Sequence, residues 1–146
     1  MNSDGPAPQQ LSRDDCLRLL ASVSIGRIIY TRHALPAIEL VTFALDQGDI
    51  VIRTDGDGKL AAATRQAIVA FEADCLDAQQ AGWSVTAIGP SREVTDPQDR
   101  GRLQKMDLSS WPRRAQELFI RVSPEMLNGR RLDAHGQQEG HDADRF

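Results

Sequence analysis

The chain has 146 residues, of which 40% are hydrophobic and 26% are charged, and its formal net charge is −4 with a pI near 5.3. This composition is typical of one compact domain with a hydrophobic core and argues against a disordered chain or two separate domains. The acidic balance gives no general attraction to nucleic acid or to an anionic membrane, and no stretch approaches the roughly 20 apolar residues of a membrane-spanning helix. We therefore expect no nucleic-acid or membrane partner. The polar first residues do not resemble a signal peptide, so we expect a cytoplasmic location.

Polar segments border the predicted domain on both sides. Residues 1–10 and 133–146 lack apolar periodicity, so we expect flexible ends around one folded domain over 11–132. Ser12 followed by Asp15 resembles a capping box, and the apolar residues after it recur at helical spacing, which predicts a short helix. Cys16 and Cys75 have no CxxC spacing, so we expect neither a disulfide nor a zinc site, and we expect both thiols to be buried.

Runs of β-branched and aromatic residues separated by turn-like segments predict six strands. They cover residues 25–31, 36–45, 49–54, 68–74, 82–95 and 117–123. The fifth run contains Gly89-Pro90, which predicts an edge or a bulge at that point. Short helices are predicted from Lys59 to before Ala67, and from Thr95-Asp96-Pro97 through Leu103. Because strands and helices do not alternate, the fold class is mainly β, an antiparallel β-barrel with short helices.

The segment VIRTDGDGKLAAA, residues 51–63, contains the parts of an anion site. Arg53 and Thr54 end a strand, Gly56 and Gly58 relax the backbone, and Lys59 places a positive charge at the start of a helix. The Walker pattern does not fit, because Arg53 stands where it needs Gly and Leu60 where it needs Ser or Thr. The EF-hand pattern does not fit either, because Lys59 and Gln66 stand where it needs calcium ligands. From spacing alone, a plain turn and a phosphate site remain equally open.

The remaining candidates do not form a catalytic or metal-binding set. His135 and His141 lie in the polar tail and His33 in a predicted hairpin turn, so no metal ligand is predicted. The serines lack a nucleophile elbow and neither cysteine has an indicated histidine partner, so no catalytic residue is predicted.

Two tryptophans and an arginine pair each have two interpretations. Trp83 either fills the core or contacts an aromatic cofactor. Trp111 precedes a proline in a polar loop, a position that favours a ligand contact or a subunit interface. Arg130 and Arg131 are either an exposed pair or part of an anionic site.

The order of the segments SIGRIIYT, PAIELVTFAL, DIVIRTDGDGKLAAA, IVAFEAD, AGWSVTAIGPSREVTDP and FIRVSPEMLNGRRL resembles a known family. It is similar to the FMN-binding split β-barrel proteins, in particular the small actinobacterial-type branch of the pyridoxamine 5′-phosphate oxidase-like family. The resemblance covers about residues 11–132. It implies a six-stranded antiparallel split barrel that forms a homodimer, with FMN in two grooves at the subunit interface.

The resemblance also implies roles for individual residues. Arg53, Thr54, Gly58 and Lys59 would hold the FMN phosphate, and Leu40, Val41 and Thr42 would run along the flavin ring. Trp83 and Ser84 would reach the cofactor from a later strand, and Trp111 would come from the partner subunit.

The function implied is an FMN-dependent oxidoreductase that transfers a hydride or electrons from a reductant, such as a nicotinamide, to a small organic acceptor. The flavin would carry the chemistry, so no acid or base is required from the chain. True pyridoxamine phosphate oxidases have a C-terminal extension that carries substrate-binding residues, so we do not expect vitamin B6 oxidation here. The alternatives are a deazaflavin-dependent reductase and a non-catalytic flavin-binding or regulatory module. Glu39 motivates the module, because a carboxylate beside the flavin would disfavour its reduced anion.

Overall fold

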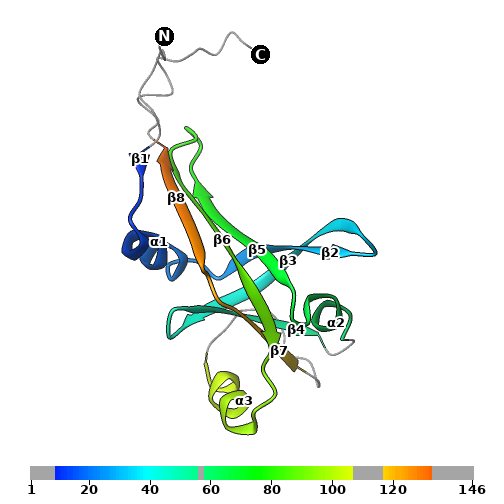
Figure 1. Cartoon of the computed structure of the whole chain (residues 1–146). Coiled ribbons are helices and arrows are strands. Elements are labelled where there is room, and N and C mark those ends of the chain that lie inside the picture. The colour runs from blue at the N-terminus through cyan, green and yellow to red at the C-terminus, as the bar shows by residue number, and fades with distance from the viewer. Residues whose placement is uncertain (1–8, 56–57, 107–116, 133–146) are drawn as a thin grey trace.

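An antiparallel sheet that closes on itself dominates the computed structural model, which describes residues 9–55, 58–106 and 117–132 (Figure 1). The strands are β1 (Gln9–Gln10), β2 (Ile25–Arg32), β3 (Leu35–Asp46), β4 (Asp49–Asp55), β5 (Ile68–Leu76), β6 (Gly82–Glu93), β7 (Glu117–Val122) and β8 (Met126–Leu132). The helices are α1 (Arg13–Leu20), α2 (Lys59–Thr64) and α3 (Pro97–Gln104).

Six of these strands make the barrel. Their order is β6, β5, β2, β3, β4 and β7, and a further pairing of β6 with β7 closes the ring. The prediction of a mainly β, six-stranded antiparallel barrel is therefore confirmed. Two strands lie outside the ring, since β8 pairs with the first part of β6, and β1 pairs with β8. Gln9 and Gln10 thus form a strand, where the sequence predicted a flexible end up to residue 10.

The middle of β6 is the point where this strand changes neighbours. Residues up to Ile88 pair with β8, and residues from Ser91 pair with β7. Gly89 and Pro90 lie between the two ladders, which agrees with the predicted interruption at Pro90. A Cβ on Gly89 would lie 1.7 Å from the carbonyl oxygen of Ser123, so only glycine allows the two backbones to approach this closely.

The barrel interior is filled by apolar side chains that alternate along the strands with outward-facing ones. Two helices add to this core, α1 through Cys16 and Leu20, and α2 through Leu60 and Ala61. Ser12 caps α1 by accepting a hydrogen bond from the Asp15 backbone N–H at 3.1 Å, as the capping box predicted. No helix within the described ranges is long and apolar enough to cross a membrane.

The expectation for the second cysteine is wrong. Cys75 is exposed, whereas Cys16 is buried in the core. Cys75 follows the inward-facing residues Phe71 and Ala73 along β5, but it lies at the end of that strand, next to the turn at Asp77. A side chain that faces inwards is buried only where neighbouring strands and side chains cover it, and at the end of β5 they do not cover Cys75.

Helix α3 packs on the outside of the barrel. Leu103 forms a second apolar cluster with Val51, Val94 and Phe119. The helix begins as predicted, with Asp96 accepting a hydrogen bond from the Asp99 backbone N–H and Pro97 in the first turn.

A buried charge network attaches α3 to the β3–β4 turn. The Asp46 carboxylate accepts hydrogen bonds from Arg102 of α3 at 2.6 Å and from Arg121 of β7 at 2.7 Å. Arg121 also lies 3.3 Å from Asp49, and its side chain is only 5% exposed. The hydrogen bonds from Arg102 lower the pKa of Asp46 from its ordinary value, and those from Arg121 act in the same direction while burial opposes them.

Replacing Asp46 by asparagine should destabilise the fold by about 3 kcal/mol near neutral pH, because the buried Arg121 loses a charged partner. The folded-state pKa of Asp46 is lowered, so its contribution is present above the ordinary value of 3.8 and is lost as the pH falls below it. Urea unfolding should therefore show the difference between wild type and Asp46→Asn shrinking towards acidic pH. The exposed Asp14→Asn is the control and should change stability little at either pH. A pH-independent difference would contradict this role of Asp46.

Candidate functional site

Two of the predicted residues meet on the outer face of the barrel. Thr42 of β3 and Arg53 of β4 are direct partners in the ladder, so their side chains leave the sheet on the same side. Thr42 is 7% exposed. The Arg53 guanidinium lies 3.2 Å from Glu117 Oε2, and both side chains are 11% exposed. A hydroxyl and a paired arginine therefore lie together at the point where the ladder between β3 and β4 ends.

The loop after β4 brings a second cation into the same region. Gly58 has a φ of 75°, a left-handed conformation that favours glycine, and Lys59 follows it as the exposed first residue of α2. Gly56 lies outside the described residues. Thr54 points to the opposite side of β4 from Arg53, because its ladder partner is Leu118.

Helix α2 is held in place by its other end. The Ser91 hydroxyl of β6 donates hydrogen bonds to the carbonyl oxygens of Thr64 and Ala67. Thr64 and Leu60 are buried, and α2 also contacts β2 and β7. Lys59 therefore projects from a short helix that is anchored to the barrel on its buried side.

The strand segment predicted to follow a cofactor ring divides between the two faces. Leu40 is 56% exposed on the outer face, as is the less accessible Thr42, while Val41 packs into the core. Ile25 of β2 is the ladder partner of Thr42. Ile25 lines a depression of about 370 Å³ on the outer face. The other lining residues are Val23, Ser24, Arg27 and Asp74.

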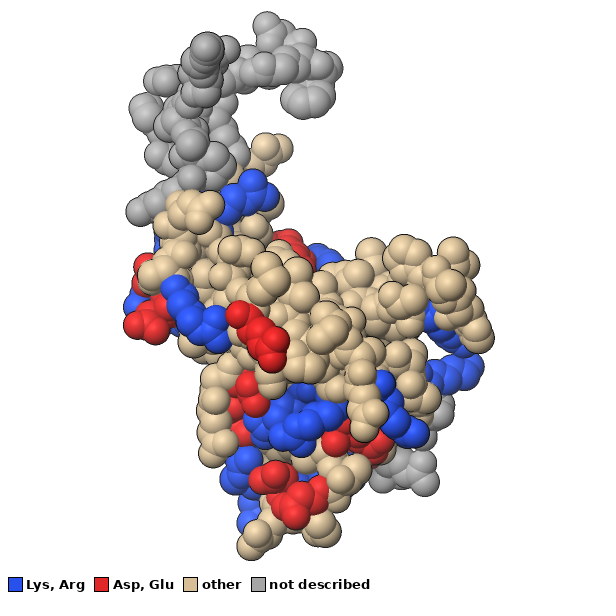
Figure 2. Space-filling view, viewed as in Figure 1, with Lys and Arg blue, Asp and Glu red and all other residues tan. Residues whose placement is uncertain are grey.

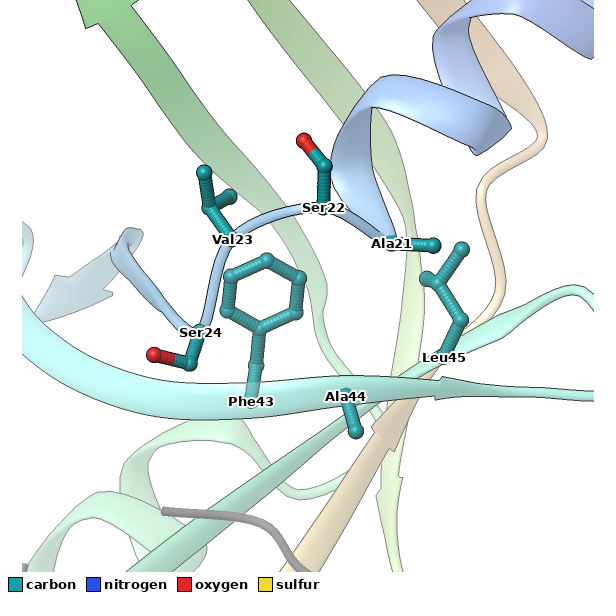
Figure 3. A pocket seen from close by; sticks show the side chains of 7 residues that line it. All are labelled: Ala21, Ser22, Val23, Ser24, Phe43, Ala44 and Leu45. Carbon is teal, nitrogen blue, oxygen red and sulfur yellow. The ribbon is translucent and has the colours of Figure 1, made fainter. Parts of the chain in front are cut away.

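A second depression lies on the other side of the segment between α1 and β2. It measures about 380 Å³, and Figure 3 shows the side chains around it. Its lining residues are Ala21, Ser22, Val23, Ser24, Phe43, Ala44 and Leu45. No charged side chain lines it, and the Ser22 hydroxyl is already donated to the Leu19 carbonyl at 2.6 Å. Thr42 lies between the two depressions, since its ladder partner Ile25 lines the first and the next residue, Phe43, lines the second.

The two later-strand residues lie on opposite faces of β6. Trp83 is 7% exposed within the barrel core, which is the first of its two interpretations. Ser84 faces outwards, and its ladder partner Asp74 lines the depression beside Ile25. Trp111 lies outside the described residues. The structure therefore pairs Thr42 with Arg53 on the outer face, begins α2 four residues after the end of β4, and places Trp83 in the core.

The other candidates are exposed or lie outside the described ranges. His33 is exposed in the β2–β3 turn, as predicted, and Arg130 and Arg131 are both exposed on β8. His135 and His141 are not among the described residues. On the face in Figure 2, positive and negative side chains are interspersed over the lower part of the molecule, and the projecting β2–β3 hairpin is mostly uncharged.

Glu117 is a site residue that sequence reasoning missed. Its side chain pairs with Arg53, and its backbone carbonyl accepts a hydrogen bond from Arg100 of α3 at 2.9 Å. The Arg100 guanidinium also lies 5.7 Å from the centre of the Phe119 ring. No motif marks Glu117, which opens the predicted strand ELFIRVS; only the pairing of β4 with β7 places it beside Arg53.

Glu39, which motivated a non-catalytic function, faces away from this cluster. Its carboxylate accepts a hydrogen bond from the Tyr30 hydroxyl at 2.6 Å. Glu39 alternates along β3 with the outward-facing Leu40, so it leaves the sheet on the side opposite Thr42. The structure thus gives Glu39 a partner on the other face of the sheet.

A closed six-stranded antiparallel barrel with short helices, in which Thr42 and Arg53 are paired on the outer face, defines the class of small antiparallel β-barrel proteins. The chain belongs to the pyridoxamine 5′-phosphate oxidase family, whose sequence model matches residues 12–131. The uncharacterized protein Rv0080 of Mycobacterium tuberculosis is 39% identical over 131 residues, which cover 86% of each chain.

Two solved structures extend the comparison. The FAD binding protein from Mycobacterium smegmatis is 35% identical with a TM-score of 0.75, over 85% of this chain and 98% of that one. A putative pyridoxamine 5′-phosphate oxidase from Corynebacterium glutamicum is 28% identical with a TM-score of 0.77, over 87% of this chain and 95% of that one.

Proposed function

We propose that this protein is a flavin-binding oxidoreductase that transfers a hydride or electrons to a small organic acceptor. The observation that carries the proposal is the pairing of Thr42 with Arg53 on the outer face, next to Ile25 of the slot, with Lys59 opening α2 shortly after β4 ends. Family membership and the FAD binding protein of Mycobacterium smegmatis support the choice of a flavin. FMN is the expected form, and FAD shares the same flavin and its first phosphate.

The residues of the site fit a flavin phosphate on chemical grounds. Arg53 and Lys59 are cations near the end of β4, and charge-assisted hydrogen bonds to a phosphate are the strong ones. Gly58 lets the chain turn into α2, and Thr54 lies at the same strand end, facing inwards. We assign the phosphate to Arg53, Gly58 and Lys59, because Thr54 leaves β4 on the other face.

The ring would lie along the outer face of β3. Leu40 and Ile25 provide apolar surface on either side of Thr42, whose hydroxyl can orient the ring edge. A volume of about 370 Å³ is near the lower end of ligand pockets, so a second protein surface is needed to exclude water from the ring. The bound flavin would supply the redox chemistry, and the chain would hold, orient and shield it.

That second surface is a second copy of this chain. One row of outward-facing residues crosses five neighbouring strands, and every member is apolar: Ile38, Ile29, Ala70, Ile88 and Met126. Ile38 is 67% exposed and Met126 57%, while the three between them are half-buried. A continuous exposed apolar row of this kind indicates an interaction surface. Thr42 lies on the same face, so a homodimer formed there would cover the slot beside Ile25.

The absorbance spectrum of the purified protein, alone and after addition of FMN, FAD or a deazaflavin, tests the proposed function. We expect a bound flavin spectrum that bleaches when NADH, NADPH or dithionite is added. Protein that binds neither FMN nor FAD would refute the proposal. A deazaflavin that displaces both flavins would indicate the deazaflavin-dependent alternative. A bound flavin that resists all three reductants would indicate a binding module.

Replacing Lys59 by alanine should weaken flavin binding by about 1.5–3 kcal/mol, because a charge-assisted hydrogen bond to phosphate is lost. Fluorescence titration measures the change. Lys105→Ala, which removes the exposed lysine at the end of α3, is the matched control and should bind like wild type. Equal affinities of wild type and Lys59→Ala would remove Lys59 from the site.

Replacing Ile38 by lysine should convert the homodimer into a folded monomer, because it places a charge at the most exposed position of the apolar row. Sedimentation velocity measures the assembly state, and circular dichroism checks the fold. Flavin affinity should fall together with dimer formation.

The control is Leu35→Lys, which makes the same change at an exposed leucine of β3 that leaves the sheet on the face opposite Ile38. It should remain dimeric. A monomeric wild type, or an Ile38→Lys protein that stays dimeric, would argue against this surface.

A further inference from the structure

Two carboxylates share one arginine on the outer face of the sheet, next to the apolar row. The Arg27 guanidinium lies 2.7 Å from Glu72 Oε1 and 3.4 Å from Asp74 Oδ2, and the described ion pairs of both carboxylates are with Arg27. Burial raises the pKa of Glu72 from its ordinary value, and the neighbouring Asp74 carboxylate raises it further while Arg27 opposes the rise. One negative charge is therefore left in excess on this face.

An exposed arginine stands on the same face two strands away. Asp74 of β5 is the ladder partner of Ser84 on β6, and Ser84 is the ladder partner of Arg130 on β8, so these three side chains leave the sheet on the same side. Two strand spacings, about 10 Å, separate the backbones of Asp74 and Arg130. Arg130 is exposed and forms no ion pair with a described residue. The face thus carries an excess anion on one side of β6 and a cation on the other.

A second copy packed face to face on this sheet can bring these two charges together. The two-fold axis of such a dimer lies between the two sheets, and an axis that runs along β6 sets β5 of one copy against β8 of the other, because these strands flank β6. Residues paired across the ladder then meet the same row of the partner. Asp74 faces Arg130 of the partner subunit, and Ala70 of the apolar row faces Met126 of the partner subunit. This one axis joins opposite charges and keeps apolar residues against apolar ones.

Other axes on the same face bring the charges into unfavourable positions. An axis along β5 would place Glu72 and Asp74 against the same two carboxylates of the partner subunit, and an axis along β2 would place Arg27 against itself. An axis across the strands, along the apolar row, would place Glu72 against Ile68 of the partner subunit and bury its charge without a new partner. The charges of this face therefore favour the axis along β6.

We propose that Arg130 of each copy pairs with Asp74 of the other copy, and that these two symmetric ion pairs set the two-fold axis of the homodimer along β6. The inference rests on the homodimer of the proposed function, and it deepens it by naming the residues that orient the partner. The same axis sets β1 of the partner subunit against β2, whose Ile25 lines the slot. The apolar row supplies the contact area, and the ion pairs select one arrangement of it.

The test uses two charge-reversed variants of the full chain, Asp74→Lys and Arg130→Glu. Each variant alone sets like charges against each other at both contacts, so its dimer dissociation constant should rise by about tenfold or more. An equimolar mixture should recover a dimer close to wild type, because one contact joins the native Asp74 and Arg130 and the other joins the two reversed charges. Sedimentation velocity measures the assembly, and circular dichroism checks the fold. Mixing cannot restore an ion pair that forms within one chain, so the rescue identifies a contact between copies.

Arg131→Glu is the matched control. It makes the same change one residue further along β8, on the opposite face, since the ladder partner of Arg131 is Trp83 of the core. This variant should dimerise like wild type and should not rescue Asp74→Lys. If Asp74→Lys does not fold, Asp74→Asn and Arg130→Gln test the same contact, and their effects on the dissociation constant should not add in the double variant.

The outcomes separate this inference from the proposed function. Single variants that dimerise like wild type, variants that do not associate on mixing, or additive effects in the double variant would overturn the ion pair and leave the homodimer and flavin binding intact. A monomeric wild type would overturn the homodimer and this inference together.

Discussion

The close approach of two backbones at Gly89 is the constraint on which the barrel depends. β6 has to pair with β5 along its whole length while its other edge serves β8 first and β7 afterwards. The change of partner takes place at Gly89 and Pro90, which lie between the two ladders. Gly89 has no side chain to collide with the Ser123 carbonyl, and Pro90 has no N–H that would need a partner there. Closure at this point brings β7 beside β4, and that pairing places Glu117 next to Arg53.

Closure of the barrel also gives every strand an inner face that packs in the core and an outer face that is left for other contacts. The inner face is occupied by large side chains such as Phe43 and Phe71. These two rings pack edge to face, and their centroids lie 4.7 Å apart. The stability of the fold therefore comes mainly from apolar packing in the barrel core and in the cluster under α3. The outer face of β2, β3 and β5 is left for polar groups, the slot beside Ile25 and the apolar row.

The six barrel strands and three helices were predictable because each carries a local signal. Alternating β-branched residues, the Ser12 and Asp96 caps, and Pro97 all act within a few residues of sequence. β8 lacked such a signal, since MLNGRRL contains two arginines and an asparagine and becomes a strand by pairing with β6. The pairing of Arg53 with Glu117 depends on a ladder between distant segments, which periodicity does not reveal.

The way β8 is covered determines whether its free edge can pair with another strand. A free strand edge offers unpaired backbone groups to other chains and favours open-ended strand addition. Here β1 occupies part of that edge, the Leu11 N–H continues the pairing to the Gly129 carbonyl at 3.0 Å, and α1 contacts the same strand. The protein's own N-terminal segment thus acts as an edge guard, which blocks the addition of another strand along the part of β8 that it covers.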